Sequence, residues 1–231
     1  MLYATKDDQK IRPQPGMRAK CPACGDDVIA KCGGVKVWHW SHLAADCDPW
    51  SEPETEWHLT WKERFPQECR EVVIGNHRAD VLTKSGIVIE FQHSSISTEE
   101  IEERESFYGE RMMWVIDASP FSANVGPFIE GSDDGLIFDL EWRFRRKTWW
   151  SSRRPKFFCF GDRGMRGDWM SRKKGEEEWT GKNNLLYIKE LYDPEMIKTL
   201  HRESYDGMTY LYRVGTARSV SVDRFLGKYA K

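Results

Sequence analysis

Two acidic residues and an amide in the middle of the chain have the types and spacing of a divalent-cation site. Asp80 and Glu90 lie in two β-rich runs separated by Lys84-Ser85-Gly86, which suits a three-residue hairpin loop. Such a loop places Asp80 directly opposite Glu90, with Cβ atoms about 5 Å apart. Like charges this close repel, so the pair predicts a cation such as Mg²⁺ between them. Gln92, two residues after Glu90, falls on the same strand face.

The same spacing also suits two solvent-facing acids on an exposed hairpin, without any function. The neighbours of Glu90 favour the functional alternative, because Val88, Ile89 and Phe91 indicate a strand buried on at least one face. A buried carboxylate needs a partner.

A second group of residues has the spacing of a zinc site. Cys21 and Cys24 form a cysteine knuckle, and His39 and His42 follow at a distance seen in Cys₂His₂ sites. Cys47 is close enough to replace either histidine. The alternative is that the cysteines are reduced and pack as small hydrophobic side chains. We expect a structural Zn²⁺ that fixes the following helix.

The elements that must position these residues follow from local patterns. Residues 1–19 predict a hairpin, and strands over 28–31 and 35–38 predict a zinc-ribbon-like hairpin. A helix over 52–64, capped by Ser51, precedes strands over 72–74, 78–83 and 87–91, a helix from Ser97 to about 110 and a strand over 113–116. Weaker patterns predict strands over 136–140, 156–160 and 185–188 and a helix over 194–200. The order from 52 to 117 is therefore α-β-β-β-α-β, within an α/β protein divided into residues 1–50, 51–120 and 121–231.

Composition excludes several classes of protein. The 231 residues contain 35 Lys and Arg against 37 Asp and Glu, a net charge of -2, so the whole chain is neither a histone-like polycation nor an acidic tail. Six cysteines are too few for a disulfide scaffold. The first residues lack an apolar signal core, and the run 118–129 is too short to span a bilayer. We expect a cytoplasmic protein that has no membrane partner.

A basic and aromatic stretch follows residue 140. Its cations predict a phosphate-binding groove in which tryptophan rings stack on bases; they are Arg143, Arg145, Arg146 and Arg153, with Trp149 and Trp150 between them. An equally good alternative is a strand with one core face and one solvated face.

Several short motifs occur in a specific order along the chain. They are Cys21-Pro-Ala-Cys24-Gly25, His39-Trp-Ser-His42, Glu54-Thr-Glu56-Trp-His58, Trp61-Lys62, Arg78-Ala-Asp80-Val, Glu90-Phe-Gln92-His-Ser94, Arg104 and Phe107-Tyr108. Together they resemble the competence protein CoiA-like family over residues 1 to about 117. This family is regarded as a branch of the PD-(D/E)XK nuclease superfamily, a restriction-endonuclease-like fold whose core is α-β-β-β-α-β. The resemblance agrees with the order of elements predicted independently.

The resemblance implies a nuclease site. Asp80 and Glu90 are expected to hold Mg²⁺ or Mn²⁺, and Gln92 stands where the superfamily more often has lysine. Glutamine can only form hydrogen bonds, so the metal or another residue must supply more of the positive charge. Glu56 matches the acid that the first helix supplies, although the helix dipole alone also favours an acid there.

The resemblance also suggests residues that contact phosphate. His58 and Lys62 lie one helical turn apart and are expected to face the nucleic acid. Arg104 is expected to clamp a phosphate, the alternative being an ion pair with Glu100 one turn earlier. His93 is either a proton shuttle or a neighbour on the opposite strand face, and the pleat favours the second.

These predictions combine into a metal-dependent deoxyribonuclease linked to DNA uptake, recombination or repair. Its expected partners are DNA and a recombination or other DNA-processing protein. The alternative is a zinc-stabilised nucleic-acid-binding module without turnover, acting as an adaptor or as an inhibitor of another DNA-processing protein.

Overall fold

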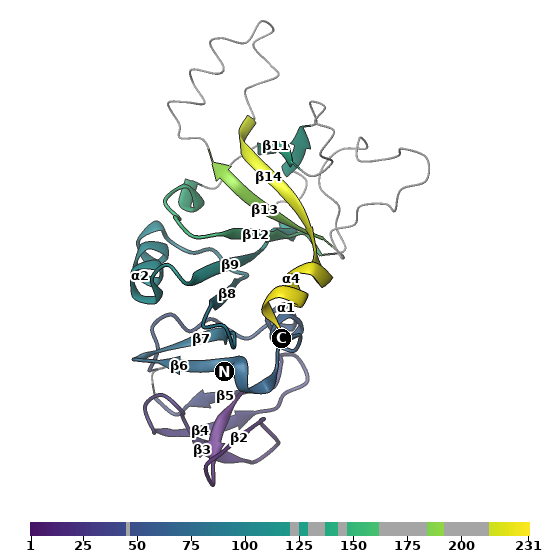
Figure 1. Ribbon diagram of the computed structural model, residues 1–231. Helices are drawn as coiled ribbons and strands as arrows, with labels where there is room; N and C mark the ends of the chain where they lie inside the picture. Colours follow the sequence, from purple (N-terminus) through teal and green to yellow (C-terminus); the bar gives the residue numbers. More distant parts are fainter. Residues whose placement is uncertain (45–46, 121–124, 129–136, 143–146, 162–183, 192–212) are drawn as a thin grey trace, which may run out of the picture. The chain divides into compact units, whose positions relative to one another are not determined.

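The computed structural model describes residues 1–44, 47–120, 125–128, 137–142, 147–161, 184–191 and 213–231 (Figure 1). The chain forms two compact units, Met1–Phe91 with Tyr229–Lys231 and Gln92–Lys228. The described part is mixed α/β, with few helices. The division into residues 1–50, 51–120 and 121–231 stays a prediction.

The first unit begins with a five-stranded antiparallel sheet in the order β2-β1-β3-β4-β5 (Figure 1). Its strands are β1 (Ala4–Lys6), β2 (Gln9–Ile11), β3 (Arg18–Lys20), β4 (Asp27–Lys31) and β5 (His39–His42). Val28 and Trp40 are buried and form the core of this module with Ala4 and Ala19.

The strand predicted over 35–38 is wrong. Lys31 pairs with His39, so the intervening residues form the hairpin loop. Val35 is 98% exposed and Trp38 is 46% exposed, and neither has the buried strand face that its β-propensity would need.

The rest of the first unit contains α1 (Glu56–Lys62), a 3₁₀ turn (Gln67–Cys69), β6 (Arg70–Ile74), β7 (His77–Leu82) and β8 (Val88–Gln92). Antiparallel pairing places β7 between β6 and β8. The helix begins later than predicted, because its cap is Thr55 and not Ser51. The Thr55 Oγ1 atom accepts a hydrogen bond from the backbone N–H of His58 at 3.3 Å.

The predicted hairpin register is confirmed. Val81 pairs with Ile89 and Leu82 with Val88, which is the alignment that brings Asp80 opposite Glu90. Gly86 has a φ of 75°, as the three-residue loop requires, and its N–H donates to the carbonyl of Thr83 at 2.8 Å.

The second unit contains α2 (Thr98–Tyr108), β9 (Met112–Asp117), β10 (Val125–Phe128), β11 (Ile137–Trp142), a 3₁₀ turn (Lys147–Trp150), β12 (Lys156–Cys159), β13 (Asn184–Leu191), β14 (Arg213–Ser221) and α4 (Val222–Tyr229). Its strands lie in the order β10-β11-β14-β13-β12-β9, and among the pairings of these described strands only that of β12 with β9 is parallel. Ser97 caps α2 as predicted, since its Oγ accepts from the N–H of Glu100 at 3.1 Å.

From α1 to β9 the helices and strands follow the predicted order α-β-β-β-α-β. The sequence did not predict β10, β14 or α4. The helix predicted over 194–200 lies outside the described residues. Within the described ranges, no helix is both long enough and apolar enough to cross a membrane.

A buried polar network supports the second unit. Glu105 accepts hydrogen bonds from Trp114 Nε1 at 2.9 Å and Ser152 Oγ at 2.6 Å. Lys156 Nζ donates to the carbonyls of Ser152 at 2.8 Å and Arg154 at 3.2 Å. Burial lowers the pKa of Lys156 to about 8, although attraction by Glu105 opposes that shift.

This low pKa predicts a rise in stability at alkaline pH. The folded state releases the Lys156 proton near pH 8, whereas the unfolded chain holds it to about pH 10.5, so unfolding takes up a proton in this window. The free energy of unfolding should therefore gain up to about 3 kcal/mol from this group as the pH rises through it. Urea unfolding of the wild type and of Lys156→Met at several pH values measures this gain. Parallel pH profiles for the two proteins would contradict it.

Candidate functional site

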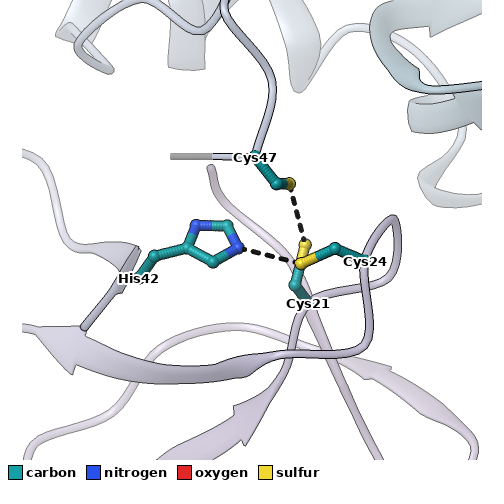
Figure 2. A group of neighbouring side chains, drawn as sticks. All are labelled: Cys21, Cys24, His42 and Cys47. Carbon is teal, nitrogen blue, oxygen red and sulfur yellow. Dashed lines mark hydrogen bonds between the residues drawn. The ribbon is translucent and has the colours of Figure 1, made fainter. Parts of the chain in front are cut away.

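Four side chains of the N-terminal module converge on one point (Figure 2). They are Cys21, Cys24, His42 and Cys47, and their ligand atoms all lie within 4.8 Å of one another. The Cys21 and Cys47 sulfurs are 3.7 Å apart, and the Cys24 sulfur is 3.4 Å from His42 Nε2. We call this group the Cys/His cluster.

Local backbone geometry aims these side chains. Cys21 follows β3, and its N–H and carbonyl bond to Asp26 at 2.8 Å and Gly25 at 3.0 Å, which closes the knuckle turn. Gly25 has a φ of 78°, a left-handed conformation that glycine adopts at low cost. His42 ends β5, opposite Val28 of β4. The knuckle and the strand end are therefore held by backbone hydrogen bonds.

The distances fit a tetrahedral metal ion. With Zn–S bonds of about 2.3 Å and Zn–N bonds of about 2.0–2.1 Å, a tetrahedron has S···S edges of about 3.8 Å and S···N edges of about 3.5 Å. The two measured separations, 3.7 Å and 3.4 Å, are close to these edges. The Cys/His cluster could therefore hold an ion such as Zn²⁺ with three sulfurs and one nitrogen.

Two thiols of the cluster, those of Cys24 and Cys47, are hard to ionise without a cation. Burial and the neighbouring thiols of Cys21 and Cys24 raise the pKa of Cys47 to about 12, and burial also raises the pKa of Cys24. A bound cation reverses this effect, since it stabilises the thiolates and releases their protons.

His39 is not part of the cluster, which corrects its prediction as a ligand. Its Nδ1 lies 2.8 Å from the carbonyl of Val37. His39 and His42 are three residues apart on β5, and residues at an odd spacing on a strand point to opposite faces. The alternate ligand, Cys47, completes the group.

The two acids of the hairpin are adjacent in the structure. The N–H of Asp80 donates to Glu90 Oε1 at 3.3 Å, and the N–H of Phe91 donates to Asp80 Oδ2 at 2.9 Å. Glu90 is buried, whereas the Asp80 side chain is 19% exposed. Each acid thus accepts a backbone N–H from the opposite strand, and both offer oxygen ligands, the type that a hard divalent cation prefers.

A buried lysine joins this acidic pair to two further carboxylates. Lys62 Nζ lies 2.8 Å from Asp80 Oδ1, 3.1 Å from Glu71 Oε1 and 3.2 Å from the Glu54 carboxylate. Burial alone would lower the pKa of Lys62, but attraction by Asp80, Glu54 and Glu71 raises it well above its usual range. Lys62 therefore carries a permanent charge inside the protein. It does not face solvent, as a phosphate-binding residue would.

Glu71 connects the same lysine to the first residues of the chain. Its carboxylate accepts hydrogen bonds from the N–H of Leu2, at 2.8 and 2.9 Å to its two oxygens, and from the N–H of Tyr3 at 3.0 Å. Burial would raise the pKa of Glu71, but the charges of Lys62 and Arg78 lower it. Glu71 has a φ of 46°, an unusual backbone conformation that these contacts support.

Other predicted residues of the first helix lie elsewhere. Glu56 is exposed in the first turn of α1, and Glu54 is the acid of this segment that contacts Lys62. His58 is buried, with Nε2 at 3.0 Å from the carbonyl of Phe91 and Nδ1 at 2.9 Å from Thr55 Oγ1. Both ring nitrogens thus lie within hydrogen-bond distance of protein atoms.

In the second unit, Gln92 is 1% exposed and donates from Nε2 to the carbonyl of Ser94 at 3.2 Å. Arg104 is also buried. Its Nε donates to Glu100 Oε1 at 3.0 Å, and its guanidinium lies 5.9 Å from the centre of the Trp114 ring. The Arg104–Glu100 ion pair, which was expected as the alternative to a phosphate clamp, is thus present.

The basic stretch is described only in part, since Arg143, Arg145 and Arg146 lie outside the described residues. Arg153 is exposed. Trp149 is buried, and its ring packs edge-on against Trp114 at a centroid distance of 5.4 Å. This tryptophan is therefore a core residue and not a stacking surface for bases.

One pair was missed at the sequence level. His93 Nδ1 lies 2.8 Å from Asp117 Oδ2, and the other Asp117 oxygen accepts from the N–H of Ser119 at 2.9 Å. No local spacing predicts this pair, because His93 directly follows β8 and Asp117 ends β9.

Comparison with known families gives two matches. The model described as "Competence protein CoiA, N-terminal domain" matches residues 8–49, and the model described as "Competence protein CoiA, nuclease-like domain" matches residues 70–129. The first includes every residue of the Cys/His cluster, and the second includes Asp80 and Glu90. No curated protein and no solved structure matches the chain.

Metal analysis tests the ligand set of the Cys/His cluster. We expect one zinc per chain in the purified protein, loss of that zinc in Cys47→Ser and its retention in His39→Ala. The reason is that Cys47, and not His39, lies with the other three ligands. Elemental analysis of the dialysed proteins provides the measurement, and zinc loss in His39→Ala alone would refute the assignment.

The buried Lys62 ammonium predicts a large stability effect. Lys62→Met should cost about 3–5 kcal/mol of unfolding free energy at neutral pH, because it leaves buried carboxylates without their cation. The deficit should shrink in acid, as those carboxylates become protonated. Lys84→Met is the control: its side chain is 59% exposed and 3.9 Å from Glu68, so its effect should stay below about 1 kcal/mol. Similar urea midpoints for both variants would contradict the prediction.

Proposed function

The chain belongs to the competence protein CoiA-like family, and from this membership we propose that it is a metal-dependent nuclease. Its substrate is DNA, whose phosphodiester bonds it hydrolyses during uptake, recombination or repair. The observation that carries the proposal is the adjacent pair Asp80 and Glu90, in which the backbone N–H of Asp80 donates to Glu90 Oε1 at 3.3 Å, inside the segment that matches the nuclease-like domain.

The proposal includes a PD-(D/E)XK core. The order α1-β6-β7-β8-α2-β9 is the order of that core, and the paired acids lie on its second and third strands. This arrangement supports the assignment because a hairpin of two adjacent strands brings the two carboxylates together.

Asp80 and Glu90 would hold the Mg²⁺ or Mn²⁺ ion. When bound, such an ion lowers the pKa of its water ligand and offsets the negative charge that develops on the phosphate. Both candidate ligands are oxygen donors, as these ions prefer.

The side chains around the pair prepare it for a cation. Burial would raise the pKa of Asp80, but the charge of Lys62 lowers it, so Asp80 is ionised at neutral pH. Lys62 supplies a fixed positive charge 2.8 Å from this carboxylate, which Gln92 cannot do. Glu54, whose carboxylate also contacts Lys62, takes the role of the first-helix acid that was expected of Glu56.

One observation favours the second candidate, a nucleic-acid-binding adaptor or inhibitor without turnover. Both oxygens of Asp80 are already engaged, Oδ1 by Lys62 and Oδ2 by the N–H of Phe91. Each carboxylate oxygen has a second lone pair, which leaves room for a metal bond. We therefore place the nuclease first.

A cleavage assay separates the two candidates. Wild type should cleave single-stranded, duplex or branched DNA with Mg²⁺ or Mn²⁺, and Asp80→Asn and Glu90→Gln should each lose at least about 100-fold in rate, since outer-shell partners of a metal alone are worth 10- to 100-fold. Glu68→Gln is the matched control, an exposed acid of the same unit. DNA binding by all proteins, with no cleavage by any, would establish the adaptor.

A further inference from the structure

A buried aspartate next to the Cys/His cluster binds the strand that carries Asp80. Asp48 is 3% exposed. Its Oδ2 accepts from the N–H of Arg78 at 2.9 Å, and its Oδ1 lies 3.0 Å from His77 Nδ1 and accepts from the N–H of Trp50 at 3.0 Å. One carboxylate thus holds both the segment after Cys47 and the first two residues of β7.

Two further contacts join the same segments. The ring of Trp50 stacks on His77 with centroids 3.3 Å apart and planes within 9°. Arg78 Nη2 donates to Ser51 Oγ at 3.1 Å. The segment from residue 48 to 51 is therefore fastened to the start of β7 by a carboxylate, an aromatic stack and a side-chain hydrogen bond.

The two ends of this connection are functional candidates. Asp48 directly follows Cys47, a member of the Cys/His cluster, and Arg78 stands two residues before Asp80 on the same strand face. An ion that fixes Cys47 would also restrain the backbone of Asp48, and Asp48 holds the start of β7, two residues before Asp80.

We propose that Asp48 is a positioning residue through which an ion in the Cys/His cluster orders Asp80. The role predicted from sequence, fixation of the following helix, is thereby extended to strand β7. The inference rests on the proposed function only where it treats Asp80 as a cation ligand; the coupling between the cluster and β7 does not require catalysis.

The test is a coupling cycle on the full chain, with two readouts. The first is Mn²⁺ affinity by electron paramagnetic resonance, in which Asp80→Ala measures the Mn²⁺ that binds at other sites. The second is amide exchange across residues 78–82. Each is measured with zinc bound and after chelation, in the wild type and in Asp48→Asn. Asp27→Asn, an exposed acid 2.9 Å from Lys20, is the matched control.

In the wild type and in Asp27→Asn, zinc should tighten Mn²⁺ binding by at least about fivefold and slow exchange at Arg78. Asp48→Asn should still bind one zinc, because all four ligands remain, yet zinc should no longer change either readout. A purely structural Asp48 would lower the unfolding midpoint and leave this zinc effect intact, which would overturn the proposal.

Two outcomes need a separate comparison. If chelation unfolds the wild type, the zinc-loaded proteins decide: Asp48→Asn must show weaker Mn²⁺ binding and faster Arg78 exchange than Asp27→Asn, and equality of the two refutes the coupling. If no protein binds Mn²⁺, the cation site of the proposed function fails, and amide exchange alone decides whether Asp48 transmits the state of the cluster.

Discussion

The first unit depends on one buried ammonium group. Lys62 brings together carboxylates from three places in the sequence, Glu54 before α1, Glu71 on β6 and Asp80 on β7. Burial alone would raise the pKa of Glu71 and of Asp80, and the charge of Lys62 lowers the pKa of both. The same contact therefore fixes the end of α1 against two strands and sets the electrostatic state of the candidate catalytic acid.

Glu71 extends this constraint to the N-terminal module. Its carboxylate accepts hydrogen bonds from the amides of Leu2 and Tyr3, just before β1. Glu71 therefore connects the five-stranded sheet to Lys62 and the carboxylates around it. Asp48 makes a second, independent connection from the cysteine-containing segment to β7. Two buried carboxylates therefore hold the N-terminal module against β6 and β7, and the proposed coupling between the Cys/His cluster and β7 would act through such contacts.

Local signals predicted much of this structure, and long-range contacts account for the rest. The Ser97 cap, the Lys84-Ser85-Gly86 loop and the Asp80–Glu90 register depend on neighbours in sequence, and each was predicted correctly. His39 was misassigned because the spacing of a helical zinc ligand pair was applied to a strand. The roles of Lys62, Glu71 and Asp48 depend on partners between 8 and 69 residues away, and no periodicity or motif encodes such pairings.

The charge count around Lys62 supports a cation at the acidic pair. Glu54, Glu71 and Asp80 contribute -3, and Lys62 and Arg78 contribute +2, which leaves -1 before Glu90 and the N-terminal ammonium are considered. The amides of Leu2 and Tyr3 satisfy Glu71, so the excess falls largely on the side of Asp80, the member of the cluster whose side chain is 19% exposed. A divalent cation bound by Asp80 and Glu90, as proposed above, would balance this excess.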